Sequence, residues 1–268
     1  MNTSAFRAFI TLKVALLSIL AAGLSASAAD VGLYGSNQFT DQLIRIDTNA
    51  GSSTTVGALG FDSVFGLAYD TTRGVVWGSD TATDQLLSID INTGAGTAIA
   101  SPGFGGITGL AYDSTHDIIF GSDVQTAQLI RISPTTGAGT AVGMTGAPIR
   151  GLAYNPFTAT LYGTSVGTLY TINTTTGVAF AVGQIGFGNV DALAFDAATN
   201  ILYGADNGEL SSQLITINTS TGAGTSVGNI GNTRVQGMTM VPEPTASLLL
   251  AGTGAALAML RRRRSRNG

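Results

Sequence analysis

The chain has 268 residues and a formal net charge of −4, with 44% hydrophobic and 10% charged residues, six prolines and no cysteine. This apolar content can bury a core, which excludes a solvated disordered protein, and six prolines without a Gly-X-Y period exclude a collagen. Because the chain has no cysteine, disulfides, zinc–thiolate sites and cysteine nucleophiles are excluded too. His116, Glu209 and Glu243 are the only histidine and glutamates, so few groups remain for acid–base catalysis.

Residues 1–29 have the features of a secretory signal peptide. Arg7 and Lys13 give a positive start, residues 14–24 are apolar, and the small residues 26–29 offer a cleavage site. A first transmembrane helix is the alternative, but the apolar stretch is short for a membrane span. We therefore expect an N-terminal signal helix, cleavage by signal peptidase and export.

The middle of the chain, residues 30–241, contains an internal repeat with a period of 40 to 45 residues. One block reads Gly-Leu-Ala-Tyr-Asp in its clearest copies, and its copies begin at Gly66, Gly109, Gly151, Ala192 and Gly237. A second block reads Leu-Tyr-Gly-Ser or similar, and its copies begin at Leu33, Val76, Ile119, Leu161 and Leu202. Two further blocks complete each repeat, and every block reads as a short strand between turn residues.

Four strands per repeat at this spacing are typical of β-propeller blades, so five copies predict an all-β, five-bladed propeller. The chain enters on a second strand and leaves on a first strand. The last blade should therefore combine residues 236–241 with residues 32–57 and close the ring. Leu202-Tyr203-Gly204-Ala205-Asp206 loosely resembles the second strand of NHL and gluconolactonase-like propellers, a likeness of fold alone. A parallel β-helix is the rival fold, but its rungs are usually shorter.

The C-terminal segment, residues 242–268, has three parts in a fixed order. Pro242, Glu243 and Pro244 come first, sixteen uncharged and mostly apolar residues follow at 245–260, and four arginines come next. These arginines are Arg261, Arg262, Arg263 and Arg264. As a transmembrane helix, 245–260 would be about 24 Å long, slightly short of a hydrocarbon core, and the arginines would stop transfer on the cytoplasmic side.

This order closely resembles the PEP-CTERM sorting signal, although the resemblance covers only about the last 28 residues. The resemblance implies that an exosortase in the inner membrane recognises Pro242, Glu243 and Pro244 and removes the tail. It also implies a Gram-negative bacterium that makes extracellular polysaccharide, with the mature protein at the cell surface or in the matrix. An ordinary C-terminal membrane anchor is the alternative.

A candidate ligand site follows from the way the copies diverge. The residue just before the first position of the Gly-Leu-Ala-Tyr-Asp block differs in every copy, while the residue before it stays apolar. These divergent residues are Phe65, Thr108, Arg150, Asp191 and Gln236. If the block is the innermost strand, they form a ring at the channel mouth that suits a sugar or another small polar ligand. In the alternative interpretation the channel holds only solvent, and Arg150 and Asp191 pair with each other.

Other chemistry is less well supported. The four aspartates Asp80, Asp84, Asp123 and Asp206 could suggest calcium, but their spacing fits turn formation better, and we expect no metal or cofactor. A glycosidase needs two placed carboxylates, and the ring offers only Asp191, with Glu209 in a loop. The acidic body, which has no lysine, disfavours nucleic acid.

The sequence therefore predicts an exported, monomeric, non-catalytic surface or matrix protein that binds polysaccharide or protein. An exported hydrolase or lyase acting on matrix sugars is the alternative.

Overall fold

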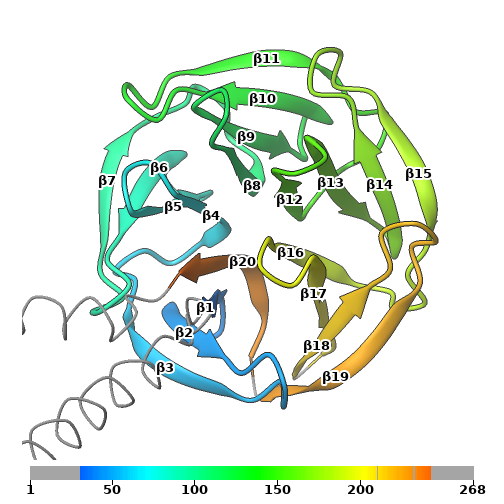
Figure 1. Ribbon diagram of the computed structural model, residues 1–268. Coiled ribbons are helices and arrows are strands. Elements are labelled where there is room, and N and C mark those ends of the chain that lie inside the picture. Colours follow the sequence, from blue (N-terminus) through cyan, green and yellow to red (C-terminus); the bar gives the residue numbers. More distant parts are fainter. Residues whose placement is uncertain (1–30, 210, 232, 243–268) are drawn as a thin grey trace, which may run out of the picture. The chain divides into compact units, whose positions relative to one another are not determined.

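The computed structural model describes residues 31–209, 211–231 and 233–242, which form twenty strands. The strands make five sheets of four strands each, arranged around a common centre (Figure 1). Neighbouring strands within a sheet are antiparallel, as in the pairing of β1 with β2 and of β4 with β5. The predicted five-bladed propeller is confirmed, and the parallel β-helix is excluded.

The blades are numbered here in chain order, with the strands of each blade given from the centre outward. Blade 1 contains β20 (Val235–Pro242), β1 (Val31–Asn37), β2 (Gln42–Ile46) and β3 (Ser53–Ala58). Blade 2 contains β4 (Val64–Asp70), β5 (Val75–Asp80), β6 (Gln85–Ile89) and β7 (Gly96–Ala100). Blade 3 contains β8 (Ile107–Asp113), β9 (Ile118–Asp123), β10 (Gln128–Ile132) and β11 (Gly139–Met144). Blade 4 contains β12 (Leu152–Asn155), β13 (Thr160–Ser165), β14 (Thr168–Ile172) and β15 (Ala179–Gln184). Blade 5 contains β16 (Val190–Asp196), β17 (Ile201–Asn207), β18 (Ser212–Ile217) and β19 (Gly224–Gly231).

Blade 1 closes the ring by joining the two ends of the described chain. Its innermost strand β20 pairs with β1, so that Leu33 lies opposite Met240 and Val31 lies opposite Pro242. The predicted closure by N-terminal and C-terminal strands in one blade is therefore present. A shared blade of this kind links the ends of the ring through a full ladder of backbone hydrogen bonds.

The innermost strands pack directly against one another around the centre: β4 contacts β8, β8 contacts β12, β12 contacts β16, β16 contacts β20, and β20 contacts β4. A side chain has little room in these contacts. A Cβ atom added at Gly237 would lie 2.0 Å from the carbonyl oxygen of Phe65, and one at Gly109 would lie 2.5 Å from that of Arg150. The repeated glycine therefore lets neighbouring backbones approach closely.

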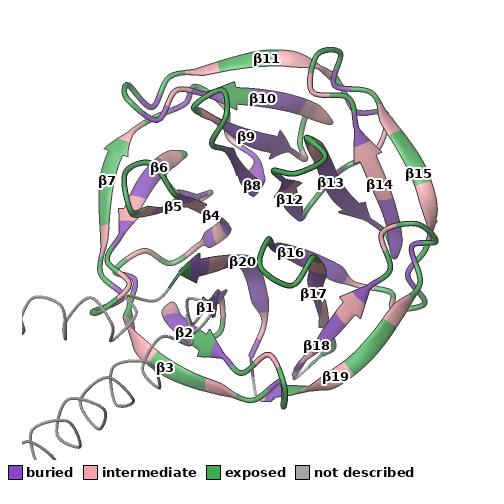
Figure 2. Cartoon of the chain, in the orientation of Figure 1, coloured by how far each residue is buried: buried purple, intermediate pink, exposed green. Residues whose placement is uncertain are grey.

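The hydrophobic core lies between the blades. Each of its five clusters combines residues of two adjacent blades, including the pair formed by blades 5 and 1. The first leucine of the third strand is fully buried in every blade, at Leu43, Leu86, Leu129, Leu169 and Leu214. Figure 2 shows buried residues toward the centre and exposed residues on the outermost strands. Apolar burial between the blades thus holds the ring together.

Several predicted features lie outside the described residues. These are the signal segment 1–29, Glu243, Pro244, the apolar segment 245–260 and the four arginines that follow it. Pro242 is described and is the last residue of β20. Among the residues that the structure describes, there is no helix with the length and apolarity needed to cross a membrane.

Candidate functional site

The five blades share one orientation, so their innermost strands all begin on the same face of the ring. We call this the start face and the opposite one the end face. The start face also carries the loops between the second and third strands, since strand direction alternates within each blade. The end face carries the turns that follow the innermost strands.

The five residues predicted as a ligand ring all lie on the start face, four of them at the beginning of an innermost strand and Arg150 two residues before β12, but they differ in exposure. The Arg150 side chain is 47% exposed and Phe65 is half-buried. Thr108, Asp191 and Gln236 are buried. Arg150 is therefore the member of the set that presents the most surface to solvent.

Direct contacts join part of this set. The Thr108 hydroxyl lies 3.3 Å from the carbonyl oxygen of Arg150, to which it donates, and Arg150 Nε lies 3.6 Å from Asp191 Oδ1. Gln236 turns to another partner and donates from Nε2 to Gln38 Oε1 at 2.9 Å. The structure therefore brings Thr108, Arg150 and Asp191 together and includes the Arg150–Asp191 pairing that the alternative interpretation expected.

The Asp191 carboxyl group is buried, and its environment alters its proton affinity. Burial raises the pKa of Asp191, while the hydrogen bond from Asn207 and the positive charges of Arg150 and Arg234 act in the opposite direction. Asn207 Nδ2 donates to Asp191 Oδ2 at 3.2 Å. Asp191 thus contacts Arg150 and offers little surface of its own to a ligand.

A buried polar cluster behind Asp191 was not predicted from the sequence. Asn207 Nδ2 also donates to the carbonyl oxygen of Val235 at 2.9 Å, and Asn207 Oδ1 accepts from the Val235 amide at 3.0 Å. The Ser212 hydroxyl donates to the same Asn207 oxygen. The available signal was an asparagine directly after the Leu-Tyr-Gly-Ala-Asp block of blade 5, since Asn207 follows Asp206 and ends β17.

Arg234 adds a second cation to this corner of the start face. Its side chain is half-buried, and its Nε atom is buried without a hydrogen-bond partner among the described residues. Two of the five arginines of an acidic body, Arg150 and Arg234, therefore flank one buried carboxyl group. Guanidinium groups bind carboxylate, phosphate and hydroxyl oxygens, which makes this corner suitable for an oxygen-rich ligand.

Two of the four aspartates considered for calcium, Asp80 and Asp123, accept hydrogen bonds within their own turns. Asp80 and Asp123 are buried, and Asp123 accepts hydrogen bonds from the Gln125 amide and the Thr126 hydroxyl. Asp206 accepts from the Asn189 amide at 2.9 Å. In the described part of the chain, no group of three or more acidic or histidine side chains is placed to hold a metal ion. The contacts of Asp80 and Asp123 agree with turn formation, whereas Asp206 holds the loop before β16.

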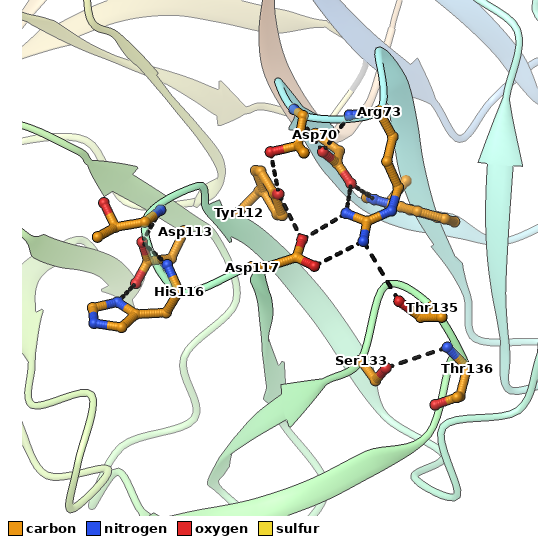
Figure 3. Close-up of polar contacts among 12 residues, drawn as sticks. Asp70, Arg73, Tyr112, Asp113, His116, Asp117, Ser133, Thr135 and Thr136 are labelled. Atoms are coloured by element: carbon orange, nitrogen blue, oxygen red, sulfur yellow. Dashed lines mark hydrogen bonds and ion pairs between the residues drawn. The ribbon is translucent and has the colours of Figure 1, made fainter.

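A second polar network, on the end face, was also missed from the sequence (Figure 3). Arg73 donates to Asp70 at 2.9 Å and to both carboxylate oxygens of Asp117, at 2.6 and 2.7 Å. Tyr112 donates to Asp117 at 2.8 Å. The bonds from Arg73 and Tyr112 lower the pKa of Asp117 to about 2. This network ties the turns of blades 2 and 3 together.

His116 lies in the same turn as Asp117 and has a local partner. Its ring is 65% exposed, and Nδ1 lies 2.7 Å from Asp113 Oδ2. Asp113 also accepts from the Thr115 amide at 2.9 Å, as its counterpart Asp70 does from Thr72. His116 is thus part of a turn that an aspartate caps.

Comparison with known proteins gives no family. No protein-family model matches the chain, and no curated protein matches it in sequence. Among solved structures, a chain in a nidogen/laminin complex aligns with a TM-score of 0.59 and 16% identity, over 79% of this chain and 98% of that one. A chain from work on the evolutionary emergence of a symmetrical protein aligns with a TM-score of 0.53 and 14% identity, over 78% and 98%.

A protein of unknown function from Bacteroides thetaiotaomicron VPI-5482 aligns with a TM-score of 0.53 and 17% identity. That alignment covers 79% of this chain and 58% of the other. At these identities the comparisons concern the fold alone.

Proposed function

We propose that this chain is an exported, exosortase-sorted, non-catalytic protein of the cell surface or extracellular matrix, and that its start face binds extracellular polysaccharide. The export and sorting parts rest on the two terminal segments, through the signal-peptide pattern of residues 1–29 and the Pro-Glu-Pro, apolar and arginine order of residues 242–268. Exosortase and signal peptidase are the processing partners, and the propeller body is the part that reaches the outside.

The observation that carries the binding role is the state of Arg150. Its guanidinium is half exposed and approaches Asp191 through Nε at 3.6 Å, and no other hydrogen bond or ion pair of this group is found among the described residues. Its two terminal nitrogens are therefore placed to donate to a ligand. An arginine held on one side by a buried carboxyl group is oriented before binding, which lowers the entropic cost of recognition.

Two other residues of the start face suit a sugar chain. Phe65 of blade 2 is an aromatic residue and Arg234 of blade 1 is a second donor, and both are half-buried. Sugar hydroxyls and uronate carboxylates accept hydrogen bonds from guanidinium groups, while the apolar faces of sugar rings pack on aromatic rings. An acidic polysaccharide fits the two arginines better than a neutral one does.

A hydrolase or lyase is the second candidate, because the raised pKa of Asp191 resembles that of a general acid. Against it, Asp191 is only 2% exposed and already bonds to Asn207, so a glycosidic oxygen has little access to its carboxyl group. A general acid must reach the atom that it protonates. The geometry therefore favours binding over cleavage.

The binding role is tested with polysaccharide purified from the host and the protein recovered from that host. Replacing Arg150→Gln should weaken binding by about 10-fold or more, since a charged hydrogen bond contributes about 1.5–3 kcal/mol. Arg131→Gln is the matched control: Arg131 is also exposed, but it lies in β10 and donates to the Thr174 carbonyl oxygen. Equal affinity for both variants would overturn the assignment of the start face.

The remaining parts of the proposal have their own measurements. The intact mass of the recovered protein should correspond to a chain that starts near Ala29 or Asp30 and ends near Pro242, Glu243 or Pro244. A chain ending at Gly268 in the membrane fraction would contradict exosortase processing. Release of reducing ends from the polysaccharide, with loss of this activity in Asp191→Asn, would instead support the hydrolase.

A further inference from the structure

The loop between the second and third strands of blade 1 carries an aromatic residue on the start face. Phe39 lies in this loop, between β1 and β2, and is 46% exposed. At the equivalent position the loops of the other four blades have small or polar residues, namely Ala82, Gln125, Gly167 and Gly208. Phe39 is therefore, like Arg150 and Asp191, a departure from the repeat that the packing of the blades does not require.

One buried side chain links this loop to Arg234. Asn37 is 5% exposed, and its Oδ1 accepts from the Phe39 amide at 3.0 Å and from the Arg234 amide at 3.3 Å. The Gln38 amide also donates to the Arg234 carbonyl oxygen at 2.9 Å. Phe39 and the second arginine of the start face thus belong to one hydrogen-bonded unit, in which the fold fixes the position of both backbones.

Two glutamines add amide groups to this unit. Gln236 is 3% exposed and donates from Nε2 to Gln38 Oε1 at 2.9 Å. Among the described residues, Gln236 Oε1 accepts no hydrogen bond and Gln38 Nε2 donates none. One acceptor and one donor group are thus left in a pair whose own hydrogen bond orients it. This combination suits a sugar hydroxyl, which both donates and accepts.

The same unit is joined to the corner of the start face around Asp191. Asn207 donates from Nδ2 to Asp191 on one side and to the carbonyl oxygen of Val235 on the other. Val235 lies between Arg234 and Gln236 in the sequence. Blades 4, 5 and 1 therefore contribute to one continuous polar strip. A polymer can occupy such a strip unit by unit, and each added contact strengthens the binding of the whole chain.

Charge differs between the two ends of this strip. The loop with the aromatic residue also contains Asp41, whose carbonyl oxygen accepts from the Leu59 amide in the segment that leads to Asp62. Burial and the nearby negative charge of Asp62 raise the pKa of Asp41. An anionic sugar is therefore repelled at the blade 1 end, whereas the two arginines attract it at the other end.

We propose that Phe39, Gln38 and Gln236 form a second sugar subsite, which takes a neutral unit of the polymer whose acidic unit binds Arg150 and Arg234. The apolar face of the neutral sugar packs on the ring of Phe39, and its hydroxyls bond to the two amides. The bound polymer is thus a heteropolysaccharide with acidic and neutral units in one chain. This inference rests on the proposed polysaccharide binding and adds the class of polymer and a second contact to it.

Replacing Phe39→Ala tests the second subsite, with Phe157→Ala as a closely matched control. Phe157 is 73% exposed, and its amide donates to Asn155 Oδ1 at 2.9 Å, as that of Phe39 does to Asn37, but its turn lies on the end face. With polysaccharide purified from the host and the protein recovered from that host, Phe39→Ala should weaken binding by about 3- to 10-fold. Phe157→Ala should leave it unchanged. Equal affinity of the two variants would overturn the second subsite.

A chemically altered polymer tests the division of labour between the two subsites. Carbodiimide and borohydride reduce the carboxylates of the host polysaccharide to primary alcohols, which removes their charge and keeps the sugar rings. On this reduced polymer Arg150→Gln should lose most of its effect, while Phe39→Ala should still weaken binding by about 3- to 10-fold. An effect of Phe39→Ala that disappears on the reduced polymer would contradict a subsite for a neutral sugar.

The outcomes separate this inference from the proposed function. If Arg150→Gln weakens binding of the natural polymer and Phe39→Ala does not, the second subsite is wrong and the polysaccharide-binding role stands. If neither variant weakens it, both are wrong. The sugar composition of the host polysaccharide gives a further check, because a polymer made only of acidic units or only of neutral ones would overturn the inferred class.

Discussion

Two arginines, one on each face of the ring, differ in how many of their donors the fold uses. On the end face Arg73 is held by Asp70 and by both carboxylate oxygens of Asp117, at 2.6 to 2.9 Å. On the start face Arg150 approaches Asp191 through Nε alone, at 3.6 Å. Both terminal nitrogens of Arg73 are used within the fold, whereas neither terminal nitrogen of Arg150 has a partner among the described residues.

The difference follows from what each arginine joins. Arg73 and Asp117 belong to turns of adjacent blades, and their two-point contact fixes those turns relative to each other. Arg150 lies just before an innermost strand, beside a carboxyl group that is itself engaged by Asn207. The distance between an arginine and an aspartate therefore says little about the role of the arginine. The number of its hydrogen-bond donors that the fold leaves unused says more.

The largest loss of stability is expected on the end face, from Asp70→Ala. Asp70 is fully buried and accepts from Thr72, Arg73 and Trp77. Its removal leaves buried donors unpaired, so we expect a loss of about 3 kcal/mol in the free energy of unfolding, measured with urea. Asp90→Ala, at an exposed turn, is the control and should cost less. Equal losses would contradict the importance of the buried network.

On the start face, Asp191→Asn should alter how stability depends on pH. Because burial raises the pKa of Asp191, the folded state holds its proton more tightly than the unfolded state does. This contribution is complete at low pH and is lost as the pH rises through the folded-state pKa. Relative to the natural chain, the variant should therefore gain stability as the pH rises from about 4, the unfolded-state pKa, through the folded-state pKa of Asp191, as measured by thermal unfolding at a series of pH values. A difference that is constant with pH would contradict this.

The smallest effect is expected from Asp117→Asn, and its pH dependence has the opposite sign. Because Arg73 and Tyr112 lower the pKa of Asp117 to about 2, its contribution is present above the unfolded-state pKa of about 4. It is lost as the pH falls from about 4 toward 2. The natural chain should be slightly more stable than the variant at pH 6, and this difference in stability should become smaller in acid. A difference that becomes larger in acid would refute the lowered pKa of Asp117.

The fold was predictable because the residues that build it recur. The glycine at the start of the innermost strand recurs wherever two backbones meet, as at Gly109 and Gly237, and the buried third-strand leucine recurs in every blade. A constraint that is repeated five times leaves a period in the sequence. Even the two alanines of blade 5, Ala192 and Ala205, keep the small size that this contact needs.

The polar networks were not predictable in the same way. Asn207 meets Val235, and Arg73 meets Asp117, across a boundary between blades, and each contact occurs at one boundary among those described. A contact that occurs at a single boundary produces no repeating pattern in the sequence. The divergent residues Arg150 and Asp191 were found because they break the repeat, but their different exposures depend on packing that the pattern does not encode.

The closure of the ring has a mechanical consequence. Val31 and Pro242 are paired at the end of an antiparallel ladder, while β20 is also packed between β16 and β4. Forces that pull these two residues apart would act on the β1–β20 pairing from one end. They would break its backbone hydrogen bonds one after another. A force applied to Pro242 alone, with the rest of the propeller held back, would act on the contacts of β20 with β1, β4 and β16 at the same time. Tension through the C-terminal side should therefore be resisted far better than tension between the two ends.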